Sequence, residues 1–416
     1  MSRSRILLLF LMVGIVARSD LARGQGLDSA LPGDIPGFQV APGLARITAR
    51  RAGAQPLGFS WQSLLILPSI GVATGYYHAP GLGVAGSALL GVTPQMRFID
   101  PIIGVAGVIR LNAERYARAP RQDTTDVTLA LGWRVQAGPD RLDLGIARAV
   151  MQEDALGLAG GDGGVGNALP YQVQVRVVRA DWRHHLGLVT LDGGLGATRS
   201  QIGSVGLAPG FRTATGLHGR MRAITTRHAP LRWVVQLDGR RTDYAGVLPG
   251  APFGTTNALA VQAGVSTPRD AIMTLRALVG AARVRVAGAQ HRGGVVPVFV
   301  LAAGWMPDRL SAIGLSVSRT DTGNPGLSLP GHPIERAGLG AALGVDRHWV
   351  VDAGLHGTQA SVSGGVAREV AVRMGLRWRI GRMVTLAPHL ADIWRSRVPG
   401  LAPHEFRAVF DVRVAP

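Results

Sequence analysis

The sequence of 416 residues contains no cysteine. This absence excludes a disulfide framework, a thiolate zinc site and a cysteine nucleophile. Lysine is absent too, so all 44 basic residues are arginine, and the formal net charge is +18. Such a charge suits a nucleic acid, an anionic surface or an acidic polymer as partner, although a high-GC genome also favours arginine over lysine.

Long apolar runs and aromatic side chains are scarce as well. Beyond the N-terminus, no run reaches the ~20 apolar residues of a membrane-spanning helix, which excludes a helical membrane protein. Aromatic residues make up 5% of the chain and charged residues 17%, while 47% are hydrophobic. Because the hydrophobic residues are spread evenly, the chain is not disordered, and its glycines lack the strict period of collagen.

The N-terminus has the pattern of a secretory signal peptide. Arg3 and Arg5 precede an apolar run over residues 6–16, and small residues follow it. Cleavage after Ser19 or Gly24 fits this pattern, whereas the run is too short for a membrane anchor. We predict a signal peptide over residues 1–24 and an exported mature chain, for which no nucleic acid partner is expected.

Two regions of different character follow. Residues 25–58 show no sustained period and contain four prolines, which predicts an irregular periplasmic segment. From residue 59 to residue 416, apolar and polar residues alternate, as they do in strands with one apolar and one polar face. Val370, Val372 and Met374, for example, alternate with Ala371 and Arg373.

The alternating segments number about 18, within a range of 16–18, and even strand numbers are typical of bacterial single-chain barrels. Their predicted first residues are Phe59, Val84, Ile102, Thr124, Arg141, Tyr171, Leu188, Arg212, Leu231, Asn257, Ile272, Val295, Leu310, Ile334, Trp349, Arg368, Val384 and His404.

The connections between these segments alternate in length. Every second connection is short and turn-like, as at residues 100–101 and 381–382, while the others are usually longer, as at residues 153–169. Seven of the eight tryptophans fall near the short-turn ends, and only Trp394 lies toward the other end. The predicted fold is therefore an all-β, closed antiparallel transmembrane β-barrel with short periplasmic turns, longer extracellular loops and a tryptophan girdle.

Two features fit this pattern less well. Pro68, Pro94, Pro297 and Pro388 fall inside predicted strands, where each removes a hydrogen-bond donor from the ladder. We expect bulges or shifted strand boundaries there. Residues 295–305 are apolar on both faces, as in a buried strand as much as a lipid-facing one.

The stretch from residue 59 to residue 416 resembles the β-barrel porin-2 family of outer-membrane proteins. Phe-Ser-Trp-Gln at 59–62 with Leu-Pro-Ser-Ile-Gly-Val at 67–72 is similar to the first strand of that family. Leu-Asn-Ala-Glu-Arg-Tyr at 111–116 and Leu-Ser-Val-Ser-Arg-Thr at 315–320 are similar to later strands. The chain departs from the usual terminal aromatic, since Phe410 is its last aromatic residue. The resemblance implies a role beside exopolysaccharide export systems.

Arginines on the polar strand faces are the candidate functional residues. They would line an electropositive lumen that attracts anionic sugars or small anions, or they would form a solvated wall of paired charges. The predicted lumen-lining residues are Arg97, Arg110, Arg134, Arg176, Arg220, Arg222, Arg240, Arg373, Arg377, Arg379, Arg407 and Arg413. Acidic partners are expected at Glu114, Asp126, Asp192, Asp238, Asp352, Glu369, Glu405 and Asp411.

Other motifs do not indicate catalysis. Residues 161–166 match GxGxxG but lie in a glycine-rich loop before an alternating strand, not between a strand and a helix. His184 and His185 are adjacent, so they would point to opposite strand faces and chelate a metal poorly. We predict no enzymatic activity, no cofactor and no metal site.

The leading functional hypothesis is an outer-membrane channel, in a Gram-negative cell, that passes an exported acidic exopolysaccharide. The alternatives are a general or anion-selective diffusion porin, an outer-membrane enzyme and a non-conducting structural barrel. The expected partners are outer-membrane lipid and lipopolysaccharide, the barrel assembly machinery, the polysaccharide and periplasmic export components.

Overall fold

The structure is a computed structural model. It describes residues 35–38 and residues 58–415 except for 81–83, 121–122, 154–170, 203–212, 226–229, 247–253, 269–271, 288–292, 309, 321–333, 347, 363–364, 382 and 397–402. The predicted signal peptide lies outside the described residues.

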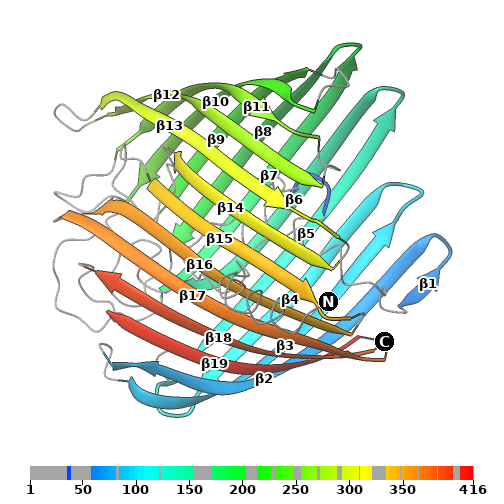
Figure 1. Cartoon of the computed structure of the whole chain (residues 1–416), viewed down its shortest axis with the longest axis vertical. Helices are drawn as coiled ribbons and strands as arrows, with labels where there is room; N and C mark the ends of the chain where they lie inside the picture. The colour runs from blue at the N-terminus through cyan, green and yellow to red at the C-terminus, as the bar shows by residue number, and fades with distance from the viewer. Residues whose placement is uncertain are drawn as a thin grey trace, which may run out of the picture.

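The described chain is almost entirely β-structure (Figure 1). The strands are β1 (Phe59–Trp61), β2 (Leu64–Ala79), β3 (Val84–Asp100), β4 (Val105–Tyr116), β5 (Thr124–Ala137), β6 (Asp140–Glu153), β7 (Tyr171–Leu186), β8 (Val189–Ile202), β9 (Thr213–Thr225), β10 (Arg232–Ala245), β11 (Thr256–Ser266), β12 (Met273–Val286), β13 (Gly293–Trp305), β14 (Ser311–Thr320), β15 (Ile334–Gly344), β16 (Trp349–Val362), β17 (Gly365–Ile380), β18 (Val384–Ser396) and β19 (His404–Val414).

The strands close into a barrel. Each strand from β2 to β19 pairs antiparallel with its neighbours in chain order, and β19 pairs with β2 from Phe406 opposite His78 to Val414 opposite Ile70. The sheet has 19 strands, and β1 only forms a hairpin with the start of β2, so the closed ring has 18. The predicted 18-strand barrel is confirmed. Among the described residues, no helix has the length and hydropathy needed to cross a membrane.

The two faces of the sheet differ as the alternation predicts. On β5, Leu129, Leu131 and Trp133 are 41%, 44% and 48% exposed, whereas Thr128 and Ala130 between them are 8% and 5% exposed. The exposed apolar face is the outer, lipid-facing face, because closing the ring in hydrocarbon leaves the polar face for the lumen.

One rim carries the tryptophans and the short turns. Trp133, Trp182 and Trp378 lie on the outer face near strand ends that meet at this rim, where Trp349 and Trp378 stack with ring centroids 4.8 Å apart. Indole rings favour the membrane–water interface, so this rim defines one edge of the apolar band. We refer to it as the tryptophan rim.

Aspartates close several turns at the tryptophan rim. The Asp346 carboxylate accepts hydrogen bonds from the backbone N–H groups of His348, at 2.6 Å, and Trp349, at 2.9 Å. These bonds lower the pKa of the Asp346 carboxyl. Asp308 accepts from the N–H groups of Leu310 and Ser311 in the same way, at 2.6 and 2.5 Å. Such side-chain-to-backbone bonds specify tight turns between neighbouring strands.

The four strand prolines lie where the ladder has pairing on one side only. Pro68 pairs with β3, Pro94 with β2, Pro297 with β12 and Pro388 with β19. The neighbouring strand on the other side of each proline does not pair with it. Because proline has no N–H to donate, it is tolerated at a strand position where no ladder hydrogen bond to a neighbouring carbonyl would be lost.

Candidate functional site in the barrel lumen

Most of the predicted lumen arginines lie on the inner face of the barrel. Their cross-strand partners place them on the polar face of the sheet, opposite to the exposed leucines and tryptophans. The inward residues are Arg97, Arg110, Arg134, Arg220, Arg222, Arg240, Arg373, Arg377, Arg379, Arg407 and Arg413. Their part in transport stays a prediction.

Arg176 lies on the other face. On β7 the valines at 173, 175 and 177 are 4%, 2% and 1% exposed, while Arg176 is exposed between them. The sequence pattern assigns the apolar side of this strand to lipid and its polar side to the lumen. The structure reverses this assignment over the first half of β7, because the valines pack inside the barrel in one cluster with Ile35 and Phe38.

Two buried carboxylates each bind two arginines on the inner wall. Asp143 accepts from Arg134 Nε at 2.7 Å and from Arg141 Nε at 2.8 Å. Asp192, which is 5% exposed, accepts from Arg183 Nε at 2.7 Å and also from Arg222.

The Asp143 cluster joins β5 and β6, and the Asp192 cluster joins β7, β8 and β9. Charge-assisted hydrogen bonds of this kind fix the positions of guanidinium groups. Asp143 and its partner Arg141 were not predicted as lumen residues, although both belong to the alternating polar face of β6.

A second set of ion pairs lies where the barrel closes. Arg395 binds Glu369 at 3.0 Å and Glu405 at 2.8 Å, linking β17, β18 and β19. Arg407 on β19 binds Glu114 on β4 at 2.9 Å, across β2 and β3. A bond that passes over two intervening strands requires the concave side of the sheet, so it independently identifies this face as the lumen.

The inner face carries more arginines than carboxylates. Inward arginines beyond the predicted lumen-lining set are Arg141, Arg179, Arg183, Arg232, Arg276, Arg336 and Arg395. Among the described residues, Arg110 has neither an ion-pair nor a hydrogen-bond partner, and its side chain is exposed on β4. Arg110 is therefore a guanidinium available to a solute in the lumen.

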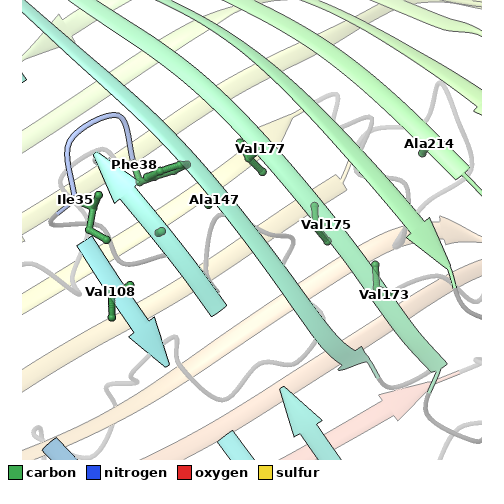
Figure 2. Packing of buried hydrophobic residues seen from close by; sticks show 9 residues of the cluster. Ile35, Phe38, Val108, Ala147, Val173, Val175, Val177 and Ala214 are labelled. Carbon is green, nitrogen blue, oxygen red and sulfur yellow. The ribbon is translucent and has the colours of Figure 1, made fainter. Parts of the chain in front are cut away.

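Four residues of the N-terminal segment are docked inside the barrel. Ile35 is 2% exposed and Phe38 1%, and both belong to one buried cluster with inward residues of β4 to β7 and β9, including Val177 (Figure 2). The Phe38 N–H donates to the Ile35 carbonyl at 3.0 Å, which closes a tight turn around Gly37 at φ +78°. The Arg179 guanidinium lies 5.7 Å from the Phe38 ring centroid. The segment predicted as periplasmic thus enters the lumen at residues 35–38, which we name the luminal turn.

Two glycines make room for the luminal turn. Gly132 on β5 and Gly145 on β6 are directly paired and face the lumen. A Cβ atom on Gly132 would overlap the Pro36 carbonyl oxygen, and one on Gly145 would lie 2.7 Å from Phe38 Cε2. The wall therefore fits the luminal turn, since any larger residue at position 132 or 145 would displace the turn.

The inner side of β12, β13 and β15 includes an apolar cluster beside the inward Arg276 and Arg336. Leu278, Ala282, Val284, Val298 and Ile334 are between 0% and 3% exposed. This explains why residues 295–305 look apolar on both faces: one face of β13 meets lipid and the other belongs to an apolar part of the inner wall. Part of the inner wall is therefore apolar, although inward arginines are found on these strands as well.

The remaining motifs do not form a site. His184 contacts Asp140, while His185 Nδ1 lies 2.8 Å from Thr190 Oγ1. Within the described ranges, no group of three or more histidines, aspartates or glutamates could hold a metal ion. The glycine-rich stretch 161–166 and most of the loop 153–169 lie outside the described residues.

Compared with protein families and with curated proteins, the chain matches none. Among solved structures it is similar to OccK2 (OpdF) of Pseudomonas aeruginosa in complex with glucuronate, with a TM-score of 0.44 and 12% identity over 84% of this chain and 98% of that one. The anion-selective porin from Comamonas acidovorans has a TM-score of 0.38 and 12% identity, over 85% of this chain and 99% of that one.

The FrpB iron transporter from Neisseria meningitidis (F3-3 variant) matches at a TM-score of 0.44 and 10% identity over 80% of this chain. The chain spans only 63% and 65% of the lengths of the two FrpB variants that it matches. These matched structures are outer-membrane porins and transporters rather than enzymes.

Proposed function

We propose that this protein is an outer-membrane channel whose arginine-rich lumen passes anionic saccharides. The observation that carries the proposal is the excess of arginine over carboxylate on the described inner face, together with Arg110, which has no partner among the described residues. Fixed positive charge along a wet path attracts anions, and weak binding at several places lets them leave again.

The finer form of the proposal is export of an acidic exopolysaccharide. It is supported by the resemblance of residues 59–416 to the β-barrel porin-2 family, whose members accompany polysaccharide export systems. Periplasmic export components would then deliver the polymer, and the barrel assembly machinery would insert the barrel. The alternative is an anion-selective diffusion porin, which the same charge distribution also supports.

Reversing the charge at Arg110 is expected to reduce anion selectivity. In a wet lumen two charges about 4 Å apart interact by about 1 kcal/mol, so R110E should lower the chloride-to-potassium permeability ratio roughly five-fold. The measurement is the reversal potential in planar bilayers under a salt gradient. R283E, on the outer face of β12, is the matched control and should leave the ratio unchanged. Equal ratios in R110E and the parent protein would contradict the proposal.

Deleting the gene is expected to move polysaccharide from the medium and cell surface into the cell. The intact gene should restore external polymer, while a variant with Arg110, Arg240 and Arg379 changed to glutamine should restore less. The measurement is the partition of polymer between medium, surface and cell. Unchanged secretion in the deletion strain would reject the export function and leave the diffusion porin.

A further inference from the structure

Three arginines form a row on the outer surface of the barrel. Arg148 on β6 is directly opposite Arg176 on β7, which is in turn opposite Arg199 on β8. All three side chains are exposed. Directly paired residues on one face have Cβ atoms about 5 Å apart, so the three guanidinium groups are neighbours. We name this set the outer arginine row.

Among the described residues, the outer arginine row has no acidic counterpart. Within the part of the chain that the structure describes, none of the three arginines makes an ion pair. The only outward carboxylate described on β6 to β8 is Asp140, which contacts His184 at the tryptophan rim. Like charges directly opposite each other destabilise a sheet, so an external anion that neutralises the row would relieve this repulsion.

The row marks a boundary on the outer face. Toward the tryptophan rim its neighbours are apolar, as Ile146 at 56% and Val178 at 55% exposed show. Toward the opposite rim the outward residues next to the row are Gln174 and Gln201, with Val150 beside them on β6. The row therefore lies where the apolar band ends and a polar zone begins.

The distance from the tryptophan rim fits a membrane interface. Arg176 is six residues from Trp182 on β7. At ~3.3 Å per residue and a strand tilt of about 40°, this separation spans ~15 Å along the membrane normal. Long arginine side chains extend several ångströms further toward the headgroups, which approaches the ~25 Å height of an outer-membrane apolar band.

We propose that the outer arginine row binds the phosphate groups of a phosphorylated glycolipid in the outer leaflet of the outer membrane. Guanidinium groups recognise phosphate through paired N–H donors, and a row spaced by one strand each can engage more than one phosphate. The tryptophan rim would then face the periplasmic leaflet, and bound lipid would fix the orientation and height of the barrel.

The test is lipid binding by the full purified chain in detergent, measured by native mass spectrometry with bisphosphorylated lipid A as the probe. We expect the triple variant R148Q/R176Q/R199Q to bind at least ten-fold more weakly than the parent protein. A triple lysine variant should retain most of the binding because it keeps the charges. Lipid A stripped of its phosphates should not be retained by the parent protein.

The matched control is R241Q, because Arg241 is also outward but is already paired with Asp243 at 3.1 Å. It should bind lipid A like the parent protein. Heat-dependent mobility on gels verifies that each variant is a folded barrel. Equal lipid A binding by the triple glutamine variant, or equal retention of the phosphate-free lipid, would overturn the proposal.

Discussion

Replacing Gly132 with valine is expected to raise the ion conductance of the barrel. A valine side chain would occupy the position of the Pro36 carbonyl, so the luminal turn could no longer dock. Undocking exposes Phe38 and Ile35, and each buried side chain of this size contributes about 2 kcal/mol, which is roughly a thirty-fold factor in the docked population for each side chain. The strand itself should tolerate valine, which favours β-structure. Single-channel recordings of the folded variant would show a larger and steadier open current.

Gly294 supplies the control for this prediction. It faces the lumen on β13, and an added Cβ there would meet nothing within 4 Å. G294V should therefore conduct like the parent protein. F38A should also raise the current, because it removes the luminal turn's buried side chain instead of changing the barrel wall. A G132V current identical to that of the parent protein would show that the luminal turn does not obstruct the path.

Replacing Asp192 with asparagine is expected to destabilise the barrel by about 3 kcal/mol, because removing one partner leaves buried charges uncompensated. Asp192 holds both Arg183 and Arg222, so the substitution affects three adjacent strands. Denaturant unfolding in detergent, followed by tryptophan fluorescence, measures the loss. The same variant should become more anion-selective, since it frees positive charge in the lumen.

Asp243 provides the comparison. It pairs with Arg241 on the outer surface, where their side chains are 44% and 58% exposed. Exposed ion pairs contribute only ~0–1 kcal/mol, so D243N should unfold close to the parent protein. If D192N and D243N unfolded at the same denaturant concentration as the parent protein, the inner ion pairs would not stabilise the wall.

Sequence periodicity predicted the strands well, since it is a local property. Predicted and observed first residues agree at Val84, Thr124, Tyr171, Ile334, Trp349, Val384 and His404. The first strand differs because the alternation from Phe59 onward is interrupted at Gln62, whose φ of 54° turns the chain back. The barrel strand begins only at Leu64.

The candidate site was less predictable because it depends on contacts between distant segments. The alternation on β7 is plain in the sequence, and Arg176 shares its outward face with Val178 and Trp182. Arg176 was misassigned because the first half of this strand is apolar on its inner side, where the valines at 173, 175 and 177 cluster with Ile35 and Phe38. The pairing of Arg407 with Glu114 likewise follows from barrel closure, which no local pattern reports.

The most direct test of the account is the reversal potential of the parent protein and of F38A in planar bilayers, with a ten-fold potassium chloride gradient. The account predicts a reversal potential displaced toward the chloride equilibrium potential for both proteins, with a larger current for F38A. A displacement toward the potassium equilibrium potential, or no conductance from either folded protein, would contradict an arginine-lined path for anions.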